Sequence, residues 1–351
     1  MTSGWQRFLR RGRPARWTRP GVDPYALAAE RRTAHLVAPE PADPVGRREQ
    51  ARRNDEAVAR LLGPEGPPVA TADHTVPVPG HADVRLRVYW PYDVPAPPGS
   101  GLPVLVYFYG GAFSLAGIDW CSRDGYYRRI AADAGLVLVA GDYAHAPEHR
   151  FPTQPEQCWR VLEWAADAAS DLGADADRVA VGGASSGGNL AAAATLLNRQ
   201  RNRRPIRLQV LEQPVLDLTA GHARTRGMSS VPGAIVRAMA RRVVRQYLGD
   251  DPAAPRDPLA SPLLAGDMSG LPPAMIWTSE LDPLSGDGEA YARALTAAGV
   301  PACCVRTIGA THTSPGMRRR VPAADHQYRD LVGTLRAALH DDPVRYPDPR
   351  S

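Results

Sequence analysis

Short, uninterrupted apolar runs, separated by stretches long enough to form a helix, constrain the fold of this chain more than any other feature. Two of these runs cover residues 104–109 and 136–140, and both have the length of a single strand. Continuous apolar runs of this length are typical of strands that are buried on both faces of a parallel sheet. Because helices must then cover the sheet, the pattern predicts an α/β protein with a mainly parallel central sheet flanked by helices.

The alternation of strands and helices continues along the chain. Residues 84–90 alternate between apolar and polar side chains, which is the period of a half-buried strand. No internal repeat of the kind found in solenoid proteins is present in the sequence. We expect further strands at 178–181, 206–211, 274–278 and 302–308, and helices at 44–62, 157–172, 189–198, 234–248, 287–298 and 323–339.

Two parts of the chain do not fit this alternation. The first 75 residues are polar and rich in Arg and Pro, and they contain one helical pattern. A second helical pattern lies in an insertion at about 219–250, between two expected strands. We therefore expect residues 1–75 to pack on the main body as an accessory segment. Residues 76–345 should form one large α/β domain that carries the insertion.

The charge of the chain does not indicate a nucleic-acid site. The formal net charge is +5, but 37 acidic residues are interspersed among 42 basic ones, all of which are arginines. No nucleic-acid recognition motif accompanies the basic residues, so we interpret them as a solvated surface. Nucleic acid is therefore not an expected partner.

Cysteine spacing and apolar content bound the class of protein further. The 4 cysteines show neither the CxxC spacing nor the neighbouring histidines of a zinc site. No stretch reaches the length of about 18 apolar residues that a membrane span needs. The Arg-rich start is not followed by the apolar segment of a secretory signal. We therefore expect a cytoplasmic protein without stable membrane insertion.

The chemistry is predicted at the point where the expected strand 178–181 runs into the expected helix 189–198. There Gly183, Ser185 and Gly187 form the pattern G-x-S-x-G. Small residues on both sides of the serine permit a sharp turn that lifts its hydroxyl clear of the sheet. On its own, a serine that merely caps a helix after a glycine turn would be the plainer interpretation. The strand–turn–helix context favours Ser185 as a nucleophile.

A serine hydroxyl needs a base that takes its proton and a carboxylate that orients this base. In the chain order Ser, acid, His, the base follows the last strand of the sheet. Only His312, His326 and His340 lie late enough in the sequence. The last two fall in or at the end of the final expected helix, where a solvent-facing side chain is the plainer interpretation. His312 follows the expected strand 302–308 in a polar loop, so we predict that it is the base.

The carboxylate should follow the preceding strand, 274–278. Glu280, Asp282 and Asp287 are the candidates. Asp287 is better explained as a carboxylate in the first turn of a helix, where the helix dipole stabilises it. Asp282 stands in a turn before Pro283. We therefore predict that Asp282 orients His312.

Consecutive glycines at the end of the expected strand 104–109 predict an oxyanion hole. Gly110 and Gly111 free their backbone N–H groups to point into the site, and the N–H of Ser186 would add a donor. We expect only the backbone of Ser186 to take part. A glycine turn that merely ends a strand is the plainer alternative when this loop is taken alone.

Together, these segments resemble the bacterial branch of the hormone-sensitive-lipase family of esterases. The family pattern HGGGF-x-x-G corresponds to YGGAFSLA at 109–116, and DYRLAPE corresponds to DYAHAPE at 142–148. The nucleophile pattern GDSAGGNLA corresponds to GASSGGNLA at 183–191. The acid pattern D-P-L-x-D-x-G-E-x-Y corresponds to DPLSGDGEAY at 282–291. The resemblance covers roughly residues 83–339.

The resemblance implies the α/β-hydrolase fold and hydrolysis of a small-molecule carboxylic ester by Ser185, His312 and Asp282. It also implies a helical cap, which would here consist of residues 1–75 and the insertion at about 219–250. Neither a metal ion nor an organic cofactor is implied, because the triad and backbone donors suffice for acyl transfer. A homodimer is left open.

Several side chains depart from the family pattern without removing a triad member. Tyr109 replaces a histidine, and Ala112 and Ala116 replace glycines. We expect Tyr109 to support the oxyanion loop from behind, and Ala112 and Phe113 to shape that loop. These departures indicate an unusual substrate or a loop geometry different from that of common short-chain esterases. Other departures include Ala184, Gly286, Thr313 and Ser314.

Two other hypotheses use the same residues. The site could transfer the acyl group to another acceptor, or catalyse lactone chemistry or an elimination in a biosynthetic pathway. A non-catalytic ligand-binding receptor on the same fold is the third hypothesis, although such a receptor usually lacks a triad residue. A fluorophosphonate probe separates this last class, because it labels only an activated serine.

Overall fold

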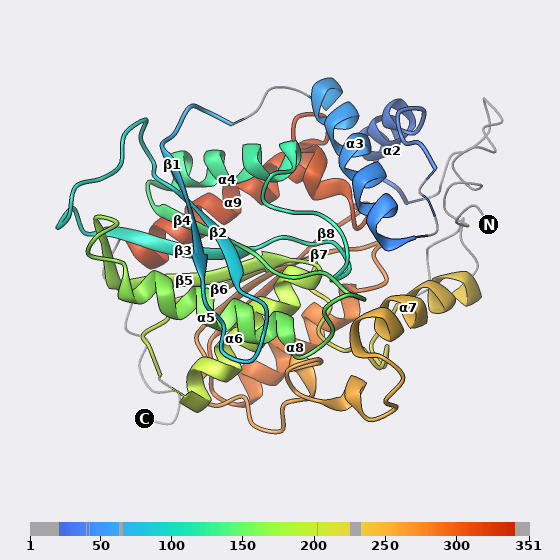
Figure 1. Cartoon of the computed structure of the whole chain (residues 1–351). Coiled ribbons are helices and arrows are strands. Elements are labelled where there is room, and N and C mark those ends of the chain that lie inside the picture. Colours follow the sequence, from blue (N-terminus) through green and yellow to red (C-terminus); the bar gives the residue numbers. More distant parts are fainter. Residues whose placement is uncertain are drawn as a thin grey trace.

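The computed structural model describes residues 21–39, 41, 43–62, 66–201, 203–224 and 233–340. In these residues, one eight-stranded sheet forms the centre of the protein (Figure 1). The strands are β1 (Thr71–Val76), β2 (Val84–Tyr89), β3 (Leu102–Phe108), β4 (Val137–Asp142), β5 (Ala174–Ala184), β6 (Leu208–Glu212), β7 (Ala274–Ser279) and β8 (Ala302–Thr307).

Helices cover both faces of this sheet. Figure 1 shows α4 and α9 above the sheet, and α5, α6 and α8 below it. The predicted α/β architecture is therefore confirmed. The helices are α2 (Pro24–Thr33), α3 (Pro44–Leu62), α4 (Cys121–Ala134), α5 (Thr153–Asp167), α6 (Ser186–Arg201), α7 (Gly233–Leu248), α8 (Ser285–Ala297) and α9 (Pro322–Leu339).

The strand order places the loops that carry the predicted chemistry at one edge of the sheet. The order is β1-β2-β4-β3-β5-β6-β7-β8. The pairs β1–β2 and β2–β4 are antiparallel, and every other neighbouring pair is parallel. The apolar side chains of β3 and β4 are almost fully buried, as their continuous apolar sequences predict. Because parallel strands end at the same edge, the loops after β3, β5, β7 and β8 meet there.

Two elements were not predicted from the sequence. Strand β1 buries only Val76, so its polar sequence carries little of the apolar signal of a strand. It nevertheless pairs with β2 along its whole length, which brings the end of the expected accessory segment into the main sheet. Helix α2 begins after Asp23, whose carboxylate accepts hydrogen bonds from two backbone N–H groups of the first turn. This N-cap and Pro24 at the first helical position are ordinary helix-start signals in a region that otherwise reads as a polar loop.

Two helices differ from their expected bounds by three residues or more at each end. The helix expected at 189–198 extends over Ser186–Arg201 as α6. The sequence predicts a helix at 157–172, but α5 begins at Thr153 and ends at Asp167. The chain then turns through Gly173, whose φ is +70°. A Cβ atom at this position would lie 2.5 Å from the carbonyl oxygen of Pro97, so only glycine fits the turn.

The accessory elements lie on the same side of the molecule. Figure 1 shows α2, α3 and α7 at the right, beside the ends of β7 and β8. Helix α2 packs on the start of α9 through a small apolar cluster of Ala26, Ala29, Val321 and Ala324. Residues 1–20, 225–232 and 341–345 of the expected segments lie outside the described residues. Among the described helices, none is long and apolar enough to cross a membrane.

Candidate active site

Ser185 lies at a strained turn between β5 and α6. Its backbone φ is +54°, a left-handed conformation that is costly for a side chain other than glycine and is found at functional sites. The flanking glycines make this turn possible. A Cβ on Gly183 would lie 2.3 Å from the carbonyl oxygen of Gly187, and one on Gly187 would lie 2.1 Å from that of Phe108. Only glycine therefore fits on either side of the serine.

The structure brings Ser185, His312 and Asp282 together from three loops. His312 Nε2 lies 3.1 Å from Ser185 Oγ, and His312 Nδ1 lies 2.7 Å from Asp282 Oδ2. Asp282 is buried, and its other oxygen accepts a hydrogen bond from the N–H of Leu284. Burial lowers the pKa of His312, but the Asp282 carboxylate more than offsets this effect, so that this pKa lies above its usual value.

The two other candidate carboxylates accept hydrogen bonds from backbone N–H groups instead of from a histidine. Glu280 accepts a 2.8 Å hydrogen bond from the N–H of Gly309. Asp287 lies in the first turn of α8 and accepts hydrogen bonds from the N–H groups of Leu216 and Asp217, after β6. Burial raises the pKa of Asp287 to about 7. Each of these two carboxylates therefore joins loops at this edge of the sheet.

The other two late histidines lie elsewhere. His326 is part of α9. His340 follows the end of α9, and its Nε2 lies 2.8 Å from the carbonyl oxygen of Ala134 at the end of α4. Their places agree with the interpretation of these two residues as structural.

The glycine loop after β3 lies directly against the nucleophile turn. A Cβ on Gly110 would lie 2.9 Å from the Cβ of Ser185, so the backbone of Gly110 lies beside this serine. A Cβ on Gly111 would lie 1.9 Å from the carbonyl oxygen of Leu115, which excludes any larger residue there. Among the described residues, the N–H groups of Gly110 and Ser186 have no hydrogen-bond partner. Both remain available to a ligand at Ser185.

The side chain of Ser186 takes part in this site, which the sequence did not predict. Its Oγ accepts a 3.0 Å hydrogen bond from the N–H of Gly111. The same Oγ lies 3.3 Å from the hydroxyl oxygen of Tyr143. One of the expected backbone donors is therefore already paired with a protein atom. Because the family pattern has alanine at this position, the departure itself was the signal that could have found this contact.

Tyr109 lies behind the glycine loop. Its buried hydroxyl oxygen lies 3.1 Å from both Asp142 Oδ1 and the carbonyl oxygen of Tyr143, so its single proton can be donated to either, and 3.3 Å from Nε2 of His145. Its ring stacks on that of Tyr143, with ring centroids 4.3 Å apart. Burial raises the pKa of the Tyr109 hydroxyl far above its usual value, so the hydroxyl keeps its proton. These contacts place Tyr109 behind the loop, and its role in supporting the loop stays a prediction.

The same loop contacts the insertion. Ala112 and Phe113 both have positive φ values, +51° and +59°. The ring of Phe113 stacks face to face on that of Tyr247 in α7, with ring centroids 3.8 Å apart. The glycine loop after β3 and α7 are therefore packed together.

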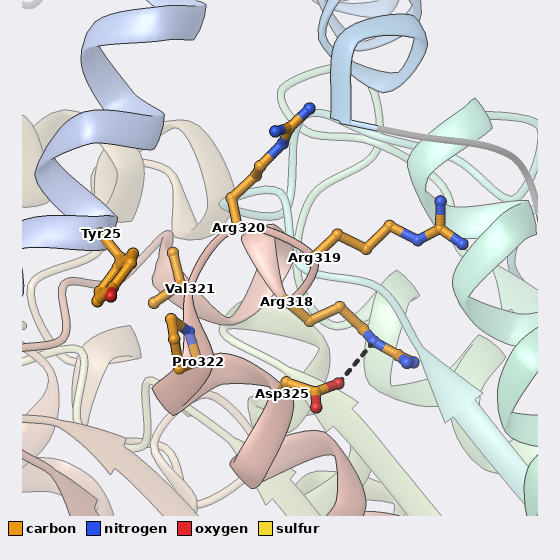
Figure 2. Close-up of a pocket in the computed structure, with 7 residues that line it drawn as sticks. All are labelled: Tyr25, Arg318, Arg319, Arg320, Val321, Pro322 and Asp325. Atoms are coloured by element: carbon orange, nitrogen blue, oxygen red, sulfur yellow. Dashed lines mark ion pairs between the residues drawn. The ribbon is translucent and has the colours of Figure 1, made fainter.

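A separate concave site is lined by three consecutive arginines. Figure 2 shows Tyr25, Val321 and Pro322 on one side, and the extended side chains of Arg318 and Arg319 on the other. Arg318 Nε lies 3.4 Å from Asp325 Oδ1. None of these residues belongs to the group around Ser185. Within the described residues, no three His, Cys, Asp or Glu side chains gather in a way that could hold a metal ion.

Comparisons with known proteins agree with this arrangement. A family model described as the alpha/beta hydrolase fold matches residues 105–315. The carboxylesterase NlhH of Mycobacterium tuberculosis is 34% identical over 278 residues, which are 78% of this chain and 84% of the relative. The ethyl acetate hydrolase of Pseudomonas putida is 34% identical over 294 residues, 83% of this chain and 90% of the relative.

A solved structure leads to the same family. The esterase of Pyrobaculum calidifontis superposes with a TM-score of 0.76 at 33% sequence identity, and the match covers 84% of this chain and 93% of that one. The matched region contains the strands and loops that carry Ser185, Asp282 and His312. The chain therefore belongs to the hormone-sensitive-lipase family of the α/β-hydrolase fold and is a serine hydrolase of the esterase type.

Proposed function

We propose that the protein hydrolyses carboxylic esters of small molecules with Ser185 as nucleophile, His312 as general base and Asp282 as the residue that orients this base. The observation that carries the proposal is the unbroken chain of contacts from Ser185 Oγ through the imidazole of His312 to Asp282. The names of the relatives, among them carboxylesterase and ethyl acetate hydrolase, support an ester as the substrate.

In the first half of the reaction, Ser185 Oγ attacks the ester carbonyl carbon while His312 Nε2 accepts the hydroxyl proton. Asp282 accepts the hydrogen bond from His312 Nδ1–H and stabilises the imidazolium that forms. The tetrahedral intermediate then collapses, its bond to the alkoxy oxygen breaks, and His312 donates the proton to the departing alcohol. The acyl group is left on Ser185.

In the second half, a water molecule takes the place of the alcohol. His312 accepts a proton from this water as its oxygen attacks the acyl carbon. Collapse of the second intermediate releases the carboxylic acid and returns the proton to Ser185 Oγ. The same groups therefore serve both halves of the reaction.

The negative charge that develops on the carbonyl oxygen needs donors that are already in place. The N–H groups of Gly110 and Ser186 are candidates, since both lie beside Ser185 and lack a partner in the described chain. The N–H of Gly111 would join them once its bond to Ser186 Oγ is broken. Helices α2 and α3, which precede β1, and helix α7 of the insertion would form the cap over the bound ester.

A panel of p-nitrophenyl esters from acetate to palmitate tests this proposal. We expect turnover of at least one ester, and loss of that turnover by on the order of a million-fold in the Ser185→Ala variant. Circular dichroism of this variant serves as the control for folding. Absence of turnover across the panel by the folded wild-type protein, or turnover by Ser185→Ala above about one per cent of wild type, would contradict it.

A further inference from the structure

Arg123 contacts the glycine loop beside Ser185. It lies in the first turn of α4, and its Nη2 donates a long hydrogen bond of 3.4 Å to the carbonyl oxygen of Gly110. Gly110 in turn lies against the Cβ of Ser185. The guanidinium therefore contacts the residue that packs against Ser185.

This guanidinium forms no ion pair within the described part of the chain. The neighbouring carboxylate of Asp124 is engaged by Arg128 at 2.6 Å and by the hydroxyl of Tyr89 at 3.0 Å. The Nε of Arg123 is buried and has no hydrogen-bond partner. A partly buried cation with an unpaired donor is costly unless an anion from outside the protein compensates it.

The buried carboxylate of Glu212 does not form an ion pair with Arg123. Glu212 lies at the end of β6 and accepts hydrogen bonds from the hydroxyls of Tyr107 and Tyr126, at 2.6 and 2.8 Å, and from Gln327 Nε2 at 3.1 Å. Three neutral donors thus satisfy Glu212. Arg123 lies near Glu212 but forms no ion pair with it.

The positive charge of Arg123 affects the pKa of His312. The pKa of His312 is raised overall, against the effect of burial, by Asp282, and the positive charge of Arg123 partly opposes that rise. Burial raises the pKa of Glu212, and Arg123 again acts in the opposite sense. Interactions of this kind require that the guanidinium lies near both groups, which agrees with its hydrogen bond to Gly110.

We propose that Arg123 binds a carboxylate group carried by the ester substrate. A guanidinium presents two parallel N–H donors that match the two oxygens of a carboxylate. A single guanidinium also balances a single negative charge. The proposal rests on the ester hydrolysis proposed above and narrows its substrate class to esters of singly anionic molecules, with the carboxylate on the acyl or on the alcohol side.

A different role for Arg123 would be to hold the Gly110 carbonyl and thereby the oxyanion loop. Loss of a loop support would lower turnover of charged and neutral esters by the same factor. Loss of a carboxylate-binding group would instead raise the KM of the charged ester selectively. Matched pairs of esters that differ only in charge separate these two roles.

The experiment compares pairs of rigid aromatic esters, and chromatography of the products measures their hydrolysis. For the alcohol side, 4-acetoxybenzoate is compared with 4-acetoxybenzamide, and for the acyl side, monomethyl terephthalate is compared with methyl 4-carbamoylbenzoate. The wild-type protein should prefer the carboxylate member of at least one pair by about tenfold or more in kcat/KM, the range of a charge-assisted hydrogen bond. The pair that shows the preference identifies the side on which the carboxylate lies.

Arg123→Met should remove this preference, so that the kcat/KM ratio of the pair falls to near one, and Arg123→Lys should retain part of it. Arg129→Met removes the same charge from the same helix and should leave the ratio unchanged. An equal wild-type rate on both members of each pair, or an equal loss on both in Arg123→Met, would overturn the proposal.

Binding to the Ser185→Ala variant provides a readout without turnover. Calorimetry should show that the carboxylate member of the preferred pair binds more tightly than its carboxamide counterpart. Arg123→Met in the same background should abolish this difference in affinity. Equal binding of the carboxylate and the carboxamide member of a pair would overturn the role proposed for Arg123. It would leave the proposed ester hydrolysis unaffected. Failure of the wild-type protein to hydrolyse any p-nitrophenyl or aromatic ester overturns the proposed function.

Discussion

The backbone N–H of Gly111 donates a 3.0 Å hydrogen bond to the side-chain oxygen of Ser186. In the proposed mechanism the same N–H is one of three that could stabilise the oxyanion. The hydroxyl of Ser186 therefore competes with the reacting carbonyl oxygen for a donor. The loop has other anchors, because the hydroxyl of Tyr143 donates a 2.9 Å hydrogen bond to the carbonyl oxygen of Tyr109.

Replacement of Ser186 by alanine should increase turnover. The change frees the Gly111 N–H for the oxyanion, and loss of one such donor in other enzymes costs about a hundredfold or more. Because the hydroxyl can also rotate away when substrate binds, we expect a smaller gain, up to about tenfold in kcat. Steady-state kinetics on the best ester of the panel measures it. A kcat below that of wild type would mean that the hydroxyl anchors the loop.

Ala112→Gly and Ala116→Gly should each stabilise the protein. Both alanines have positive φ values, +51° and +75°, at positions where the family pattern has glycine. The left-handed conformation costs alanine about 1–2 kcal/mol, and the greater freedom of glycine in the unfolded chain offsets about 0.5–1 kcal/mol of this. The free energy of unfolding should therefore rise by about 0.5–1 kcal/mol in denaturant titrations.

The matched control for these two changes is Ala337→Gly, at an exposed position of α9. Glycine in an exposed helix costs about 1 kcal/mol, so this variant should be less stable than wild type. If the two loop variants lose as much stability as Ala337→Gly, the positive φ values at 112 and 116 carry no strain.

The acid limb of the pH–rate profile should move in opposite directions in two variants. His312 must be neutral to accept a proton, so kcat/KM falls as the pH drops through its pKa. Asp282 raises this pKa and Arg123 lowers it. Asp282→Asn should therefore shift the limb to lower pH, besides costing about a thousandfold or more in turnover. Arg123→Met should shift the limb to higher pH.

The profiles are measured as kcat/KM on a neutral ester, so that the charge of the substrate does not change with pH. Arg129→Met serves as the control for loss of one positive charge and should leave the limb in place. Shifts of both variants in the same direction would contradict the account of the charges around His312.

Asp287 should make the stability of the protein depend on pH. Its pKa is raised by burial from 3.8 to about 7, so the folded protein favours the protonated carboxyl. The corresponding stabilisation is present at acidic pH and is lost as the pH rises toward 7 and above. Asp287→Asn keeps an oxygen that can accept the N–H groups of Leu216 and Asp217 but cannot ionise.

Relative to wild type, Asp287→Asn should therefore become more stable as the pH rises from 5 to 8. The relative gain in the free energy of unfolding should be a few kcal/mol at most. Urea titrations at several pH values measure this difference. Turnover of Asp287→Asn at neutral pH should far exceed that of Asp282→Asn. A difference in stability that does not vary with pH would contradict the raised pKa.

The sequence predicts those parts of the protein in which a local pattern determines the structure. The apolar runs of β3 and β4 are buried strands because no other element of that length buries both faces. The turn at Ser185 follows from glycines on both sides, at which a Cβ would collide with backbone. In contrast, β1 is a half-exposed edge strand, and its pairing with β2 rather than its own side chains makes it a strand.

The chemistry that depends on tertiary contacts could not be predicted in the same way. Ser186 is adjacent to Ser185 in the sequence, but only the folded loop brings its Oγ to the N–H of Gly111. Arg123 is one of 42 basic residues in the sequence. That it forms no ion pair is known only from the fold, in which Asp124 pairs with Arg128 and Glu212 accepts a hydrogen bond from Tyr107. Unusual side chains at family positions are a sequence signal for such contacts, but they do not name the partner.

Reaction with a fluorophosphonate, followed by peptide mass spectrometry of the labelled site, tests the central claim most directly. We predict a single covalent adduct on Ser185 in the wild-type protein, and strongly slowed labelling in Asp282→Asn and in a variant without the His312 imidazole. Ser185→Ala should remain unlabelled although it is folded. No adduct on the folded wild-type protein, or an adduct on Ser186 in place of Ser185, would contradict the assignment of Ser185 as the nucleophile.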